Sequence, residues 1–89
     1  MDEEVRKELE ALKGMVLAWK ESYRQAASPG GQDEHLADDF WEEVQTHTFP
    51  YTRRLFECQY LSESELQGFV EFCCVQVEEL RQSLRIVKA

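Results

Sequence analysis

The chain has 89 residues, of which 43% are hydrophobic and 31% charged, and its formal net charge at pH 7 is −8. This composition is typical of one small folded protein, so residues 1–89 are expected to form a single helical-bundle domain. The acidic balance argues against nucleic-acid binding and against docking on anionic lipid, both of which need a basic face. No stretch approaches the ~20 apolar residues of a membrane span, and the first ten residues lack an apolar signal segment. We therefore expect a cytoplasmic protein that binds neither nucleic acid nor membrane.

Residues 2–27 are predicted to form a long helix. Their apolar positions step by four and three in turn, which is the a/d heptad pattern of a packed helix. These positions are Val5, Leu9, Leu12, Val16, Trp19, Tyr23 and Ala26. The segment SPGGQ, residues 28–32, is expected to end this helix, because Pro and Gly commonly follow a helix C-terminus.

A second helix is predicted over residues 33–48, with Asp33 as its N-cap. Its apolar face consists of Leu36, Phe40, Trp41 and Val44. It should stop at Phe49-Pro50, because the residue before a proline avoids the helical region. A short separate helix is then expected within residues 50–61, with Pro50 at its first position and Thr48 as its cap.

The last helix has the clearest predicted start. Ser62 and Glu65 have the spacing of a capping box, and Leu61 and Leu66 flank the cap as a hydrophobic staple. A heptad seam then follows at Leu66, Val70, Cys73, Val77, Leu80, Leu84 and Val87. Because the two heptad helices have equal lengths and matching seams, we expect them to pack as an antiparallel pair in an all-α bundle of three or four helices.

The three cysteines include no C-x-x-C motif, so reduced thiols are expected rather than a disulfide framework. Cys73 lies on the seam between Val70 and Val77 and is interpreted as a core residue. Cys74 points ~100° away from it on a regular helix, so the two thiols cannot readily share one metal ion. A thiol sensor that uses Cys58 or Cys74 remains an alternative.

Residues 69–77 are apolar on almost every side of their helix. Phe69, Phe72 and Val75 lie off the heptad seam, and a helix of this kind needs cover on most of its faces. These three residues therefore predict the contact of a homo-oligomer, most simply a homodimer. The alternative is that a middle helix of the same chain covers this face.

Residues 32–50 hold six acidic residues and no lysine or arginine. Within them, side chains spaced by four residues form one line that combines imidazoles with carboxylates. This line consists of His35, Asp39, Glu43 and His47. It predicts either a metal site or a solvated face. A third interpretation is an acidic docking surface for a basic protein, formed by Asp38, Asp39, Glu42 and Glu43.

No motif in the chain points to catalysis. The chain contains no Gly-rich phosphate loop with a lysine, no H-E-x-x-H and no G-x-S-x-G. The sequence therefore favours a non-catalytic, homo-oligomeric interaction or accessory module without a cofactor. The alternative is a divalent-metal-dependent enzyme or metal-binding protein that uses the acidic helix 33–48.

Overall fold

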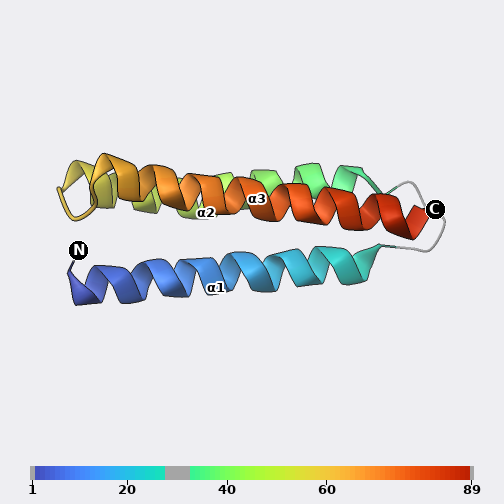
Figure 1. Cartoon of the computed structure of the whole chain (residues 1–89), viewed down its shortest axis with the longest axis horizontal. Helices are drawn as coiled ribbons and strands as arrows, with labels where there is room; N and C mark the ends of the chain where they lie inside the picture. Colours follow the sequence, from blue (N-terminus) through green and yellow to red (C-terminus); the bar gives the residue numbers. More distant parts are fainter. Residues whose placement is uncertain (1, 28–32, 89) are drawn as a thin grey trace.

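The computed structural model describes residues 2–27 and 33–88, with side chains as far as Leu84. The described residues form three helices: α1 (Glu3–Ala26), α2 (His35–Glu57) and α3 (Glu63–Lys88). They lie side by side in a slender rod with extents of 46 × 17 × 17 Å (Figure 1). The prediction of a small all-α helical bundle is confirmed. None of these helices has a stretch that is long and apolar enough to cross a membrane.

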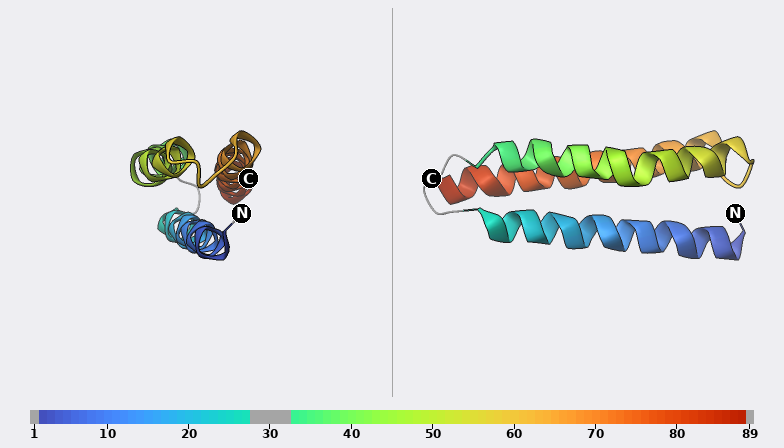
Figure 2. Two further views of the ribbon diagram at one scale, coloured as in Figure 1. Left: turned by 90° about the vertical axis from the view of Figure 1, so that its left-hand side faces the viewer. Right: turned by 180° about the vertical axis from the view of Figure 1, so that it is seen from behind.

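Helices α1 and α3 run parallel, and α2 runs antiparallel to both (Figure 2). Lys13 lies over the ring of Phe72, 5.5 Å from its centroid, and Lys20 reaches Glu79 at 2.6 Å. Residue numbers thus rise together along the two helices. The structure differs here from the antiparallel pairing expected of the two heptad helices. With one helix between them in up-down-up order, the first and third helices must point the same way.

Helix α2 is continuous through Pro50, so the predicted stop before Pro50 and the separate short helix after it are wrong. Proline lacks a backbone donor and crowds the carbonyl of Thr46, four residues earlier. Both residues are exposed, so water can satisfy that carbonyl. On the opposite side Thr48 and Thr52 are fully buried, and their hydroxyls donate to the carbonyls of Val44 (2.7 Å) and Thr48 (3.1 Å). Packing of this buried face outweighs the local preference of the proline.

The start of α3 has the predicted capping box. The Glu65 N–H donates to Ser62 Oγ at 3.1 Å, and the Ser62 N–H donates to Glu65 Oε1 at 2.8 Å. Two backbone donors that the helix itself cannot satisfy are paired in this way. Leu61, just before the cap, is buried, as a staple residue should be.

The start of α2 is less well defined. Its cap position is Glu34 rather than the predicted Asp33, and no side-chain hydrogen bond caps the helix there. The predicted helix stop at residues 28–32 and the side chain of the seam residue Val87 lie outside the described residues.

The core is built from the seams of α1 and α3 and from one face of α2. Its buried hydrophobic residues are Val5, Leu9, Val16, Ala37, Phe40, Val44, Leu61, Phe69, Cys73, Val77, Leu80 and Leu84. Cys73 is 0% exposed, which confirms its interpretation as a core residue. Burial in these apolar surroundings raises the pKa of its thiol to about 12. Cys58 and Cys74 are also free thiols, and both are exposed.

Candidate functional site

The acidic residues predicted to dock a basic partner lie in the N-terminal half of α2. Asp39 and Glu42 are exposed. Asp38 is also exposed, and its Oδ1 accepts a hydrogen bond from Arg81 of α3 at 3.4 Å. An ion pair with this exposure contributes only ~0–1 kcal/mol to stability. The acids therefore form a charged face rather than a converging site.

Glu43, the fourth of these acids, turns toward α1. It is half-buried, and its Oε2 accepts a hydrogen bond of 2.6 Å from the hydroxyl of Tyr23. This hydrogen bond to a carboxylate, with burial and the charges of Glu43 and Asp39, raises the pKa of Tyr23 to about 12. The Tyr23 ring packs on Phe40 with the centroids 5.6 Å apart. Glu43 thus places negative charge beside an aromatic part of the bundle.

The four residues of the predicted metal site follow one another along the axis of α2 and do not surround a single point. Neighbours in it are ~6 Å apart along the helix axis, too far for all four to reach one ion. Glu43 is hydrogen-bonded to Tyr23, and the His47 ring lies 6.0 Å from the ring of Trp19. Among the described residues, no group of three or more His, Cys, Asp or Glu side chains is arranged to hold a metal ion. The metal site at His35, Asp39, Glu43 and His47 stays a prediction.

The residues predicted to form an oligomer contact lie at different depths. Phe69 is 2% exposed and belongs to the core, which removes it from the predicted contact surface. Phe72 is half-buried, with its ring centroid 6.5 Å from that of Phe69 and Lys13 Nζ above it. Of the three, Val75 is the exposed one, at 50%. Packing within the chain therefore covers most of this face, and the homodimer contact stays a prediction.

The side of the bundle between α1 and α2 has a feature that the sequence analysis missed. Helix α1 packs more closely against α3 than against α2. One hollow of about 360 Å³ is lined by Trp19, Tyr23 and Leu36, and another of about 320 Å³ is lined by Tyr51 and Leu55. We call this side, with its two separate hollows, the α1–α2 groove. Its hollows are lined by Glu8, Trp19, Tyr23, Glu43 and Tyr51, and His47 contacts Trp19 on the same side.

The charges of α1 are divided between its two neighbours. Lys20 Nζ donates to Gln76 (2.9 Å) and to Glu79 (2.6 Å), both on α3. On the α2 side, Glu8 accepts a hydrogen bond from the hydroxyl of Tyr51, and this raises the pKa of Tyr51. Lys20 therefore faces α3, and Glu8 faces the α1–α2 groove.

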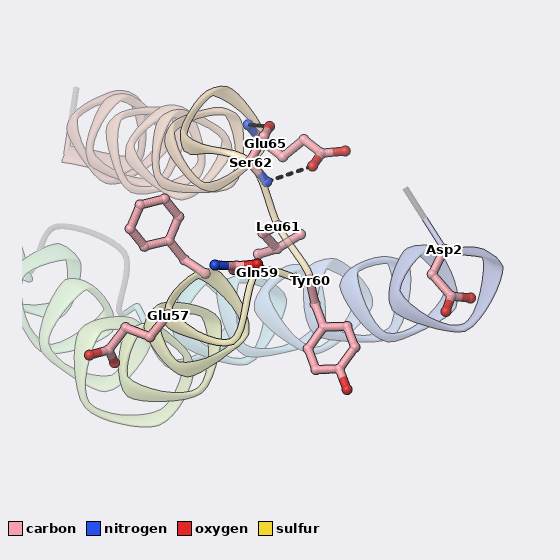
Figure 3. Close-up of a pocket in the computed structure, with 8 residues that line it drawn as sticks. Asp2, Glu57, Gln59, Tyr60, Leu61, Ser62 and Glu65 are labelled. Carbon is pink, nitrogen blue, oxygen red and sulfur yellow. Dashed lines mark hydrogen bonds between the residues drawn. The ribbon is translucent and has the colours of Figure 1, made fainter.

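A further hollow, of about 650 Å³, lies at the turn between α2 and α3 (Figure 3). Asp2, Glu57 and Tyr60 line it but point away from one another (Figure 3). Gln59 has a φ of 68°, the left-handed conformation that often closes a helix. Glu65, which also lines this hollow, is already hydrogen-bonded in the capping box. We therefore interpret the hollow as a result of the shape of the turn and not as a binding site.

Comparison of the chain with models of known families, with curated proteins and with solved structures gives no match. A function must therefore be argued from the residues themselves.

Proposed function

We propose that the chain is a non-catalytic helical interaction module that binds a basic protein through the acidic outer face of α2. One observation carries the proposal. Residues 32–50 have no lysine or arginine, whereas Lys13 and Lys20 of α1 lie against α3. The exposed acids Asp39 and Glu42 thus lie on a stretch of α2 that has no basic residue of its own. A face of this kind attracts positively charged partners and speeds their encounter.

The docking face consists of Asp38, Asp39, Glu42 and Glu43. Asp39 and Glu42 are its exposed centre, while Asp38 and Glu43 stand at its two edges, toward Arg81 and Tyr23. Because exposed acids add little to the stability of the fold, their removal tests binding without a large loss of structure.

The test compares two double variants with the same change in net charge. Asp39→Asn with Glu42→Gln neutralises the docking face, and Glu71→Gln with Glu78→Gln neutralises two exposed acids of α3. The probe is a fluorescent lysine-rich peptide, titrated at low and at moderate salt. We expect the first variant to bind about three- to tenfold more weakly, and the second to bind like the unchanged protein, with affinity that falls as salt rises. Equal losses in both variants would mean that only net charge matters, which contradicts a docking face.

A homo-oligomer is the second candidate, and the exposure of Val75 is the observation that favours it. Apolar surface at an outer helix position can be covered by a second copy. Sedimentation of the unchanged protein and of Val75→Glu tests this. If the unchanged protein is a dimer and the variant a monomer, the contact is supported. If the two proteins have the same size, the contact is wrong.

A further inference from the structure

We propose that the α1–α2 groove binds one basic amphipathic α-helix of a partner protein, with apolar side chains of that helix seated in the two hollows. This inference rests on the proposed function, and it adds the position and the chemical character of the partner. The partner helix would lie beside α1 and α2 as the fourth helix of a bundle.

The groove is long enough for such a helix. On α2 the two separate hollows are lined by residue 36 and by residue 55, which are about 28 Å apart at ~1.5 Å per residue. Between these ends, Glu43, His47 and Tyr51 follow one another at four-residue steps and share one side of α2. An amphipathic helix is recognised in a groove of this kind through anchors spaced by three, four and seven residues.

Aromatic surface provides the apolar part of the groove. Trp19 and Tyr23 are half-buried, and Tyr51 is 40% exposed. The hollow beside Trp19, of about 360 Å³, can receive a large aliphatic or aromatic side chain. Partly open tryptophan and tyrosine rings beside a hollow are the residues on which binding energy most often concentrates.

Charge decides which occupant fits. The carboxylates of Glu8 and Glu43 border the hollows, and no lysine or arginine is among the described residues that line them. A second copy of the chain, with a net charge of −8, would place acid against acid. Anionic lipid and nucleic acid would be repelled in the same way. A helix with lysine or arginine beside its apolar stripe meets carboxylates instead.

The chain contains its own reporters for this site. Trp19 lines the groove, whereas Trp41 packs edge-on against Phe49, with the centroids 5.6 Å apart, and Phe49 lines a hollow between α2 and α3. Trp41→Phe therefore leaves one tryptophan in the groove, and Trp19→Phe leaves one outside it. Binding is measured independently through the fluorescence anisotropy of a labelled peptide.

The probes are three synthetic peptides of about 18 residues, ~27 Å long as helices. The first carries leucines on one face and lysines on the other, the second replaces every lysine with glutamate, and the third scrambles the first. We expect the first to bind most tightly and to shift the emission of Trp19 but not that of Trp41. Glu8→Gln with Glu43→Gln should weaken binding about three- to tenfold. Glu71→Gln with Glu78→Gln, the matched control on α3, should change the affinity by less than about twofold.

The outcomes separate this inference from the proposed function. If the basic peptide binds and Asp39→Asn with Glu42→Gln weakens binding, but Trp19 is silent and Glu8→Gln with Glu43→Gln has no effect, the groove is wrong and the acidic docking face stands. If the acidic or scrambled peptide binds as tightly as the first, the assigned occupant is wrong. If no lysine-containing peptide binds even at low salt, both proposals fail. Self-association that shifts the emission of Trp19 without peptide makes a second copy the occupant and overturns the inference.

Discussion

Replacement of Cys73 by serine should destabilise the protein far more than the same change at Cys74. The two residues are adjacent, so helix propensity and position in α3 are nearly matched. They differ in burial, because Cys73 is 0% exposed within the apolar seam and Cys74 is exposed. The comparison therefore isolates the cost of a hydroxyl in the core.

The loss of stability in Cys73→Ser depends on whether the new hydroxyl finds a hydrogen-bond acceptor. An unpaired hydroxyl costs ~1–3 kcal/mol when it is buried in a protein. A serine at position 73 can, however, donate to the carbonyl of Phe69 four residues earlier, as Thr48 donates to Val44 in α2. We therefore expect a loss of ~1–2 kcal/mol for Cys73→Ser and less than ~0.5 kcal/mol for Cys74→Ser. At ~4–8 °C per kcal/mol for a chain of this size, the larger loss lowers Tm by about 4–16 °C.

Urea unfolding followed by circular dichroism measures both free-energy differences, with the slope checked for constancy between variants. Thiol labelling adds a second readout. Cys58 and Cys74 should react in the folded protein, and Cys73 only after unfolding. Equal destabilisation by the two serine variants, or rapid labelling of Cys73 in the native state, would refute its place in the core.

Three further predictions concern the helices and pH. Pro50→Ala should raise the free energy of unfolding by ~1–3 kcal/mol in urea titrations, because it restores a backbone donor inside α2; a loss would mean that Pro50 is not in a helix interior. Ser62→Ala should cost ~1 kcal/mol by removing half of the capping box, whereas Ser64→Ala, which removes only an exposed hydroxyl contact of 3.2 Å with Ser62, should cost much less. The thiol of Cys73 and the hydroxyl of Tyr23 have folded-state pKa values raised to about 12, from ordinary values of 9.0 and 10.0. Between pH ~9 and ~12 the unfolded chain therefore holds fewer protons than the folded one, and stability should fall as pH rises. This fall, measured by thermal unfolding, should be shallower in Cys73→Ala with Tyr23→Phe, and an unchanged slope would contradict these assignments.

The features that the sequence predicts well depend on neighbours along the chain. The heptad spacing around Cys73 places this residue in the core, and the Ser62–Glu65 capping box forms as expected. Both are encoded within one helix, so no knowledge of the other helices is needed.

The features that the sequence analysis missed depend on the partner helix. Pro50 favours a helix end locally, but burial of Thr48 and Thr52 on the opposite side keeps α2 continuous. Packing against α1 and α3 provides that burial, and a local rule cannot include it. The direction of α3 relative to α1 likewise depends on the number of helices between them. Pro50 wrongly suggested two helices there, whereas α2 is one continuous helix.

The α1–α2 groove shows the same limit. Glu43 and His47 are visible in the sequence as members of a line with metal-binding chemistry, but their partners on α1 are not. Only the structure shows that Glu43 accepts a hydrogen bond from Tyr23 and that His47 lies beside Trp19. The same residues thus form part of an aromatic and acidic surface between α1 and α2.

The most direct test of the proposed partner binding is an NMR titration of the isotope-labelled protein with the basic amphipathic peptide. Amide shifts should concentrate on the α1–α2 groove, at Trp19, Tyr23, Glu43, His47 and Tyr51, and should be small at Glu71 and Glu78 on the outer face of α3. Shifts that map to the outer face of α3, or no shifts at all, would contradict binding at the groove.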